Sequence, residues 1–450
     1  MNQMNQQMSV EQEENLTSRS SVWVVDMQNM LADTNTSEEM ARWEKVSVYR
    51  VPEWIKRLTK NDNFLPHVVS LGPFHHGKPE LLPMEEHKRR AVLHMARRSG
   101  KPVAEFAAAI EDVADELQSC YLDLDGKWRG AERDRFVEMM VADGCFLLEM
   151  ARTRQAMEGG PVVNDYATND PVYSDGSVDY LWALVRTDMV LVENQLPLLV
   201  LQKLEAVHRG TLPGAGDINR LVLFLLKREH DAEGISIDKL GLHPLDLYHK
   251  SFCGPEQELN ASKEKDVTMP SAVELAEAGV KFKKSLTKSV CDVGFKDGIL
   301  SMPGINVNNQ MPRIFLNLMA FEWLHPNCRK DVTTYIFFMD NVINSSRDVA
   351  LLRHRRNGII ENFMSSDKLA AALFSEMSKI SRMHRNSKLA VVQREVRDHF
   401  SKPWNKWRAS FVQTHLSNPF VFISLVVATI LLIATILQTA YAILSFYTGH

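Results

Sequence analysis

The stretch RTDMVLVENQLPLLVL, which runs from Arg186 to Leu201, decides how this chain can fold. Its apolar side chains indicate a helix, and the apolar pattern on both sides extends this predicted helix from about residue 179 to about residue 207. Glu193, Asn194 and Gln195 interrupt the pattern because, at about 100° per residue, they point to three different faces of a helix. No orientation exposes all three to water, so at least one must be buried and hydrogen-bonded.

Pro197 adds a second constraint, since a proline there removes the hydrogen bond to the carbonyl of Glu193 and predicts a kinked helix. We interpret Asp188, Glu193, Asn194, Gln195 and Pro197 as a structural hub that joins two halves of the protein. In this interpretation Asp188 caps a helix and Glu193 forms buried hydrogen bonds. The alternative is a catalytic carboxylate pair, but Asp188 and Glu193 diverge by roughly 140° on a helix. We therefore expect no catalytic residue among them.

Helices are predicted on both sides of this stretch. On the N-terminal side they lie at about 84–99, 102–121 and 131–152, and one more follows at about 217–229. In the C-terminal half they lie at about 312–324, 330–345, 346–354 and 367–382, and a narrow apolar stripe predicts a last helix around residues 389–400. Asp297 and Gly298, between Phe295 and Ile299, predict the turn of a small β-hairpin.

These patterns predict five segments. They are a disordered polar tail (residues 1–44), an N-terminal helical half (45–229), a polar linker (230–270), a C-terminal helical half with the hairpin (271–415) and a membrane anchor (416–447). The predicted fold class is mainly α, with a multi-helix cytosolic domain, a small β-hairpin and one C-terminal transmembrane helix.

The anchor is the clearest local signal. PFVFISLVVATILLIATIL, from Pro419 to Leu437, carries no charge and is long enough to cross a hydrocarbon core of about 30 Å. Lys and Arg residues precede it and none follows, which predicts a cytoplasmic N-terminal domain. Insertion after translation is expected, in a single-pass, tail-anchored arrangement in the plasma membrane or an endomembrane. Four N-x-S/T sequons are then chance matches, at Asn15, Asn35, Asn260 and Asn344.

Several function classes are disfavoured. The net charge of −4 gives no broad attraction to nucleic acid. The phosphate-binding and Ser-nucleophile motifs are absent. The five scattered cysteines form no C-x-x-C pair, which indicates reduced, mostly buried thiols.

A metal hypothesis is raised by His75, His76 and His87 with Glu85 and Glu86, but their spacing matches no known ligand motif. We interpret these histidines as loop residues that bind backbone carbonyls, and expect no cofactor and no metal.

Nine segments, taken in order, resemble the plant family known as domain of unknown function 247. The resemblance covers about Val48 to Tyr441 and is carried by SLGPFHHG (Ser70 to Gly77), MEEHK (Met84 to Lys88), DGCFLLEM (Asp143 to Met150), DMVLVENQLPLLVL (Asp188 to Leu201), KFKKS (Lys281 to Ser285), FKDGIL (Phe295 to Leu300), FLNLMAFE (Phe315 to Glu322), FMDNVI (Phe338 to Ile343) and SNPFVFISLVVA (Ser417 to Ala428). The chain departs from the family pattern after Glu322, where Trp323 and Leu324 replace a polar or Cys-containing continuation.

The resemblance implies a plant protein with a helical cytosolic region and one C-terminal membrane helix, and it supplies no enzyme chemistry. Some grass members are associated with pollen self-incompatibility, which implies a recognition role. We therefore expect a membrane-tethered interaction, signalling or recognition module, with the membrane and an unidentified protein as partners, and with no nucleic acid and no identified small-molecule substrate. The alternative is an unrecognised membrane-anchored enzyme such as a hydrolase. Converging titratable groups in a pocket would favour the enzyme, and an exposed apolar patch the interaction module.

Overall fold

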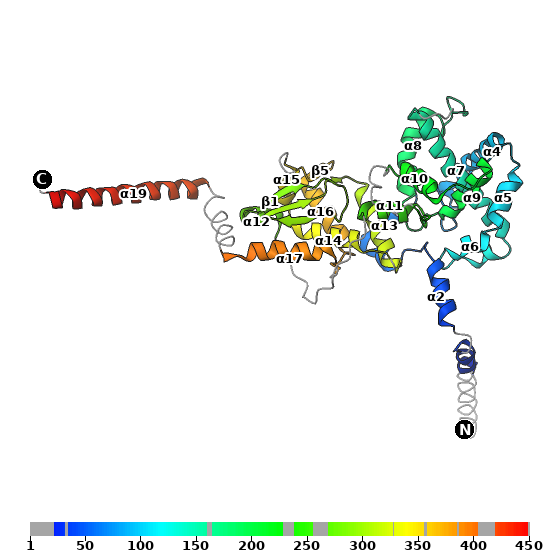
Figure 1. Ribbon diagram of the computed structural model, residues 1–450, viewed down its shortest axis with the longest axis horizontal. Coiled ribbons are helices and arrows are strands. Elements are labelled where there is room, and N and C mark those ends of the chain that lie inside the picture. The colour runs from blue at the N-terminus through cyan, green and yellow to red at the C-terminus, as the bar shows by residue number, and fades with distance from the viewer. Residues whose placement is uncertain are drawn as a thin grey trace, which may run out of the picture.

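The computed structural model describes residues 22–31, 35–159, 164–227, 238–254, 269–326, 328–354, 358–384, 387–403 and 419–448. In these residues the protein is mainly α-helical, with a few short strands and one long apolar helix near the C-terminus, which confirms the predicted fold class. Figure 1 shows two adjoining helical lobes, one built from the first half of the chain and the other from the second, with α11 and α13 between them.

The first lobe is organised around α7, whose residues from Val137 to Ala151 are nearly all buried because other helices cover it on every side. Gly144 lets α9 approach α7 closely, since a Cβ there would collide with Val200 and Leu204. The helices of this lobe are α3 (Glu53–Thr59), α4 (Leu82–Ser99), α5 (Val103–Glu111), α6 (Ala114–Ser119), α7 (Arg133–Met157), α8 (Asp175–Asp188), α9 (Leu198–Arg209), α10 (Ala215–Leu225) and α11 (Pro244–Cys253), with short 3₁₀ turns η1 (Asn61–Phe64), η2 (Pro79–Leu81) and η3 (Gly126–Arg129).

Two helix predictions need correction. The segment 102–121 contains two helices, α5 and α6, rather than one. The helix predicted from 179 to 207 is also two helices, because residues 189–197 between α8 and α9 are irregular. Pro197 is not a kink inside a helix, since it immediately precedes α9 with φ of −58°, a position where its missing N–H costs nothing.

The predicted N-terminal tail is partly helical. Residues 22–31 form a helix with exposed side chains, and α2 (Thr36–Lys45) follows with none of its residues buried. The prediction of a disordered tail is therefore wrong for these residues. Asn35 caps α2 by accepting the N–H of Ser37, which explains why this polar segment is helical. Residues 1–21 lie outside the described residues.

The predicted polar linker contains a buried helix. In the part of residues 230–270 that the structure describes, α11 buries eight of its ten residues, including Asp246 and His249. Sequence patterns missed it because these polar side chains look solvent-facing, although they are hydrogen-bonded in the interior. The prediction of a polar linker is therefore wrong for residues 244–253, which form α11.

The second lobe combines six helices with two small sheets. Strands β2 (Gly294–Lys296) and β3 (Ile299–Met302) pair antiparallel, and Asp297 and Gly298 turn between them with positive φ, which confirms the predicted hairpin. Two pairings were not predicted: β1 (Lys281–Lys284) runs parallel to β3, and β4 (Ile305–Val307) pairs parallel with β5 (Ile360–Asn362). The helices are α12 (Ala272–Glu277), α13 (Met311–Leu324), α14 (Asp331–Val342), α15 (Ser346–Arg353), α16 (Asp367–Ser378) and α17 (Lys388–Ser401).

Buried apolar residues of both lobes belong to one continuous hydrophobic cluster. The last helix, α19 (Pro419–Thr448), is different, because its described side chains are exposed. Its stretch from Val426 to Leu444 is long and apolar enough to cross a membrane.

Candidate functional site

The irregular segment between α8 and α9 carries a buried polar network. Asp188, the last residue of α8, is fully buried, and its carboxylate accepts the backbone N–H groups of His67, Val68 and Val69 at 2.8–3.1 Å. The Arg313 guanidinium of α13 donates to the same carboxylate at 2.9 Å. The helix-capping role predicted for Asp188 is therefore wrong, because its oxygens bind a distant loop instead of a helix N-terminus.

Glu193 forms the second centre of this network. One carboxylate oxygen accepts the N–H of Val51 at 2.7 Å and an ion pair from Lys56 at 2.9 Å, while His75 Nε2 lies 3.6 Å from the other oxygen. Asp188 and Glu193 thus have separate sets of partners, so the two carboxylates do not act as a pair. Glu193 is 4% exposed, which is the buried, hydrogen-bonded environment predicted for it.

Asn194 holds the chain around Asp188 in place. Its side-chain oxygen accepts the N–H of Leu71 at 2.7 Å, and its amide nitrogen donates to the carbonyls of Val69 and Asp188 at 3.0 Å. These contacts replace helical hydrogen bonds, so they explain why the backbone leaves the helix here.

Gln195 ties the same segment to α11. Its amide nitrogen donates to the carbonyls of Met189 and Leu191 at 2.7 and 2.6 Å, and its oxygen accepts the N–H of Leu245 at 2.9 Å. Glu193, Asn194 and Gln195 are therefore all buried, whereas the sequence pattern required only that at least one of them be buried.

A second set of charged residues lies beside this network and was not predicted. Lys88 of α4 is fully buried, and its ammonium group contacts Asp143 Oδ1 and Glu85 Oε1 at 2.6 Å and the Ser70 carbonyl at 2.7 Å. Asp143 of α7 also accepts the N–H of Gly72 at 2.7 Å. The available signal was a lone Asp inside the apolar run VADGCFLL of a predicted core helix, which requires a buried partner.

Two residues of α13 connect the network to the second lobe. Arg313 donates to the Asp62 carbonyl at 3.0 Å as well as to Asp188. Asn317 accepts the N–H of Val192 at 2.9 Å and donates to the Asn63 carbonyl at 2.8 Å. Sequence reasoning missed both residues, because their partners lie far away in the chain.

Burial shifts the pKa values of two titratable groups in and beside the network. Burial, and then the positive charges of Lys78 and Lys56, lower the pKa of His75 to about 3, so this imidazole stays neutral. Burial raises the pKa of Asp143, against the opposing effect of the Lys88 charge. In both groups burial is the main cause of the pKa shift, as expected for enclosed side chains.

The five residues of the metal hypothesis do not gather around one point. His75 lies against Glu193, His76 is 3.9 Å from Glu85, and His87 contacts Arg90. Neither ring nitrogen of His75 has a hydrogen-bond partner, so the expectation that these histidines bind carbonyls is wrong for His75.

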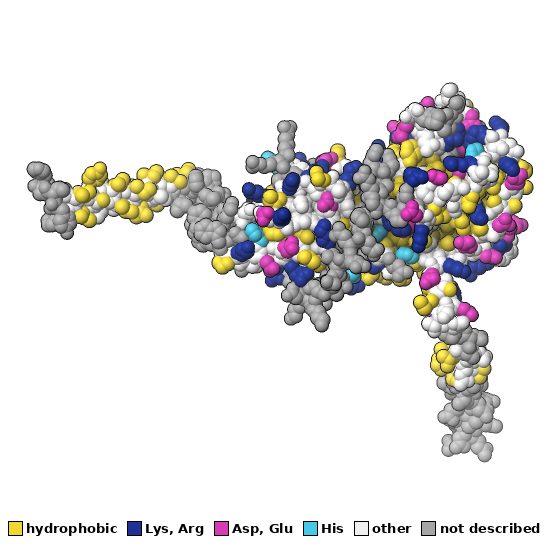
Figure 2. Space-filling model, viewed as in Figure 1, with side chains coloured by type: hydrophobic (Ala, Val, Ile, Leu, Met, Phe, Trp, Pro, Cys, Tyr) yellow, Lys and Arg dark blue, Asp and Glu magenta, His cyan; other side chains and the backbone are white. Residues whose placement is uncertain are grey.

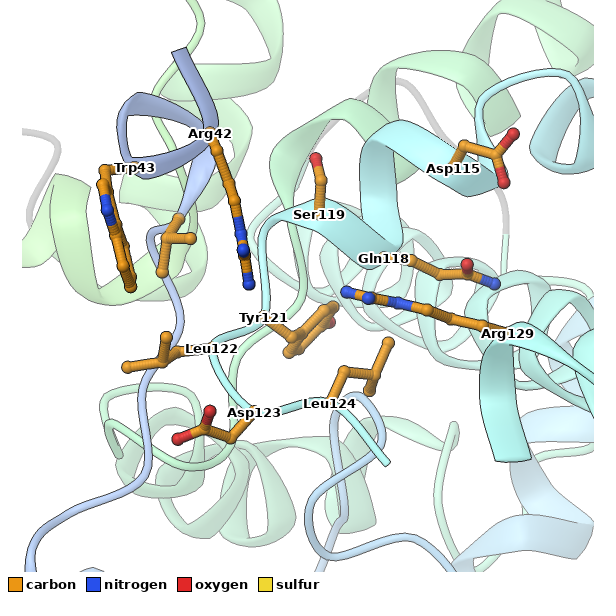
Figure 3. A pocket seen from close by; sticks show the side chains of 11 residues that line it. Arg42, Trp43, Asp115, Gln118, Ser119, Tyr121, Leu122, Asp123, Leu124 and Arg129 are labelled. Atoms are coloured by element: carbon orange, nitrogen blue, oxygen red, sulfur yellow. The ribbon is translucent and has the colours of Figure 1, made fainter. Parts of the chain in front are cut away.

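Two of the surface cavities formed by described residues lie near the lobes, and neither of these two is lined by Asp188, Glu193, Asn194 or Gln195. The first, about 530 Å³, lies between α2, α6 and η3, where Arg42 and Arg129 extend into it beside Trp43 (Figure 3). The second, about 580 Å³, lies where the lobes meet, and lysines and apolar residues share its wall.

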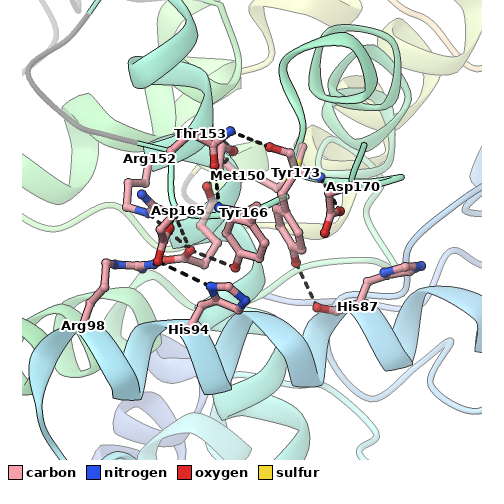
Figure 4. Close-up of polar contacts among 12 residues, drawn as sticks. His87, His94, Arg98, Met150, Arg152, Thr153, Asp165, Tyr166, Asp170 and Tyr173 are labelled. Atoms are coloured by element: carbon pink, nitrogen blue, oxygen red, sulfur yellow. Dashed lines mark hydrogen bonds and ion pairs between the residues drawn. The ribbon is translucent and has the colours of Figure 1, made fainter. Parts of the chain in front are cut away.

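A polar cluster covers the outer side of α7 (Figure 4). The buried carboxylate of Glu149 accepts hydrogen bonds from Arg98, Arg152 and the Tyr166 hydroxyl. The His94 ring stacks on the Tyr166 ring with centroids 3.9 Å apart. Through these contacts Tyr166, which precedes α8 in the chain, is held against α4 and α7, so the cluster has a structural explanation.

Comparison with known proteins identifies the group to which the chain is related. A family model described as a plant protein of unknown function, domain of unknown function 247, matches residues 48–434. The chain belongs to this family. A UPF0481 protein of Arabidopsis thaliana is 29% identical over 440 residues, which cover 91% of this chain and 88% of that protein. A second one is 22% identical over 522 residues, covering 92% and 93%. No solved structure matches the chain.

Five of the nine segments that carry the resemblance to domain of unknown function 247 meet in the buried network, and one of them is the stretch from Asp188 to Leu201 itself. SLGPFHHG supplies Ser70 and Gly72, MEEHK supplies Lys88, DGCFLLEM supplies Asp143 and FLNLMAFE supplies Asn317. The network thus brings together segments that are far apart in the sequence. At the departure from that pattern, Trp323 packs edge-on against Trp54 and donates its indole N–H to the Ile380 carbonyl.

Proposed function

We propose that this member of the plant family is a membrane-tethered protein-interaction module, of a recognition or signalling kind, with no enzymatic activity of its own. The observation that carries the proposal is the exposed apolar side of the N-terminal helix at residues 22–31. Trp23, Met27 and Leu31 recur every four residues, so they lie on one side of that helix, and they are 63%, 48% and 75% exposed. Figure 2 shows these apolar side chains on the arm that leaves the first lobe.

An apolar helical stripe of this kind fits a hydrophobic groove on a partner protein. The large charged network offers no competing explanation, because its members are buried, hydrogen-bonded to each other and absent from the walls of both cavities. Exposed apolar surface with enclosed titratable groups is the combination expected of a binding protein rather than of an enzyme.

The interaction is tested by chemical crosslinking of the full chain in native plant membranes. Trp23→Glu with Met27→Glu should remove the crosslinked adduct of the full chain, since charges on the apolar side cannot enter a hydrophobic groove. The matched control, Gln28→Glu with Asn29→Glu, adds the same charges on the polar side and should keep the adduct. Equal adducts in all forms would overturn the proposal, and labelling of the chain by an activity-based hydrolase probe would favour the enzyme alternative.

We further propose that α19 spans the membrane and that the lobes lie in the cytosol, at the plasma membrane or an endomembrane. Lys and Arg precede the apolar stretch and none follows it, which supports this orientation. A glycosylation sequon appended after His450 should then be modified, whereas Asn344, which is exposed on the second lobe, should not. A glycosidase-sensitive gel shift that depends on Asn344 would reverse the orientation.

A further inference from the structure

A buried group of thiol, imidazole and carboxylate side chains lies where α11 meets the corner between α13 and α14. His249 and Cys253 are one turn apart on α11, Glu322 is near the end of α13, and Cys328 lies in the loop before α14. The potential ligand atoms of His249, Cys253 and Glu322 all lie within 4.8 Å of one another. None of these residues belongs to the polar network described above, and nothing in the proposed function uses them.

The sulfur atoms of Cys253 and Cys328 both lie close to the imidazole of His249. Nδ1 of His249 is 3.8 Å from Cys253 Sγ and 3.7 Å from Cys328 Sγ. A tetrahedral zinc ion with Zn–N of about 2.1 Å and Zn–S of about 2.3 Å places its nitrogen and sulfur ligands about 3.6 Å apart. Each sulfur is therefore within about 0.2 Å of the nitrogen–sulfur spacing of such a site.

Glu322 is placed to orient the imidazole rather than to bind the ion. Its carboxylate accepts the N–H groups of Val332 and Thr333 at 2.8 Å, and His249 Nε2 lies 2.7 Å from the same carboxylate. With Nε2–H donated to Glu322, Nδ1 carries the free lone pair. Cys253 Sγ and Cys328 Sγ lie 3.4 and 3.7 Å from Nε2, so the ring must turn for Nδ1 to point at both sulfur atoms. A carboxylate that binds the outer nitrogen of a histidine is the usual second contact of a zinc ligand, since it fixes the ring and its tautomer.

We propose that His249, Cys253 and Cys328 bind a zinc ion, with water as the fourth ligand. Two thiolates and one imidazole form a soft ligand set that zinc prefers over magnesium or calcium. His249 and Cys253 are buried, while Cys328 is partly exposed and gives the ion a way in. The bound ion would connect α11 of the first lobe to the corner between α13 and α14 of the second lobe, and would stabilise the contact between the lobes. The alternative is a cluster without a metal ion, in which two neutral thiols lie in weak contact with His249.

The test uses the full chain in detergent, purified with a tag that contains no histidine. Zinc content is measured by mass spectrometry, and Co²⁺ is titrated as a spectroscopic probe, because a thiolate-bound cobalt ion has charge-transfer bands that nitrogen and oxygen ligands do not give. The native chain should hold about one zinc ion and show these bands. Cys253→Ser and Cys328→Ser should each weaken Co²⁺ binding at least tenfold. Cys120→Ser, which removes a partly exposed thiol from α6, should bind Co²⁺ like the native chain.

Circular dichroism of each variant shows whether it is folded, so that lost binding is not mistaken for lost structure. A folded native chain that holds no zinc and gives no cobalt–thiolate bands would overturn the proposal. A disulfide between Cys253 and Cys328 in protein from cells would also overturn it. Cobalt–thiolate bands that both serine variants keep at native strength would place the ion elsewhere.

Discussion

At the scale of single residues, buried charges determine the conformation of the chain. Asp188 and Arg313 are enclosed together, and each has further hydrogen bonds to backbone groups of residues 62–69. A buried ion pair adds little net stability, but removing one partner leaves an uncompensated charge and costs much more. These residues are therefore best understood as specifying one arrangement of the backbone.

The hub interpretation predicts a loss of stability in Glu193→Ala. The change leaves the buried N–H of Val51 without an acceptor and removes the closer, buried partner of Lys56, so the free energy of unfolding should fall by about 3 kcal/mol. Urea unfolding of the full chain in detergent measures this loss, and the cellular level should fall with it. Glu53→Ala is the matched control, because Glu53 is exposed and contacts the same lysine at 3.6 Å. Native stability of Glu193→Ala with loss of partner binding would assign Glu193 a direct functional role.

The buried residue His243 should make the free energy of unfolding depend on pH. It is fully buried, donates from Nε2 to the Ser47 carbonyl and accepts the N–H of Asp246 at Nδ1, an arrangement that requires a neutral ring. Burial lowers its pKa from 6.5 to about 4, so the unfolded chain binds a proton more readily than the folded chain between these values. The contribution of His243 to the free energy of unfolding is therefore complete above pH 6.5 and is lost as the pH drops towards 4. Between pH 7 and pH 5 the loss from this residue is about 2 kcal/mol.

The measurement compares urea unfolding of the full chain at these two pH values. His243→Asn keeps an acceptor for the N–H of Asp246 but cannot titrate, so its loss of stability between pH 7 and pH 5 should be smaller than that of the native chain by about 2 kcal/mol. His384→Asn removes an exposed histidine and should leave the pH dependence unchanged. An identical pH dependence in His243→Asn would contradict the assignment.

At the scale of elements, local signals compete with distant contacts. The Asp297–Gly298 turn follows its local signal, because both residues have the positive φ that this two-residue turn requires. Residues 189–197 do not form the helix that their apolar pattern predicts. The side chains of Asn194 and Gln195 bind backbone carbonyls that would accept backbone N–H groups in a continuous helix. The hairpin also contacts α17, where the rings of Phe295 and His399 meet edge to face.

Gly298→Ala should loosen the hairpin. The side chain has room, but φ of 76° costs an alanine about 1 kcal/mol or more. Amide hydrogen exchange of residues 294–302 should become faster while α4 and α7 stay protected. Gly294→Ala is the matched control, since that glycine has no positive φ and an added Cβ meets Ser301 Oγ at an ordinary 3.5 Å. Unchanged exchange in Gly298→Ala would show that the turn is not required to hold the strands together.

At the scale of the whole molecule, two lobes share one hydrophobic core, while α19 exposes its described apolar side chains. Contacts of Arg313 and Asn317 with the first lobe mean that the two halves are not independent units joined by a flexible connection. The helix α19 follows the last described helix of the second lobe in sequence and contributes no described residue to the core.

Removal of residues 416–450 should therefore release the protein from the membrane without unfolding the lobes. After a carbonate wash, the truncated chain should be in the supernatant and the full chain in the pellet. A control with Leu432→Arg and Ile436→Arg keeps the length but places charges in the apolar stretch, so it should also fail to integrate. Retention of the truncated chain in the washed pellet would show that another part of the protein binds the membrane.

The sequence by itself determined the helical fold class, the hairpin and the apolar C-terminal helix. These features depend on neighbouring residues: a 3.6-residue apolar period, an Asp-Gly turn, and an uncharged run with the length of a membrane span. It also indicated that polar residues near Glu193 must be buried, because no helix face could hold them all in water.

Only the tertiary structure decided what those residues bind. The partners of Asp188 lie near residue 68 and at Arg313, and no local pattern connects positions more than a hundred residues apart. The same reason explains why the break at residues 189–197, the burial of α11 and the meeting of His249 with Cys328 were not foreseen. Each is stabilised by contacts that exist only after the chain has folded, and these contacts outweigh the local preference for helix or for water.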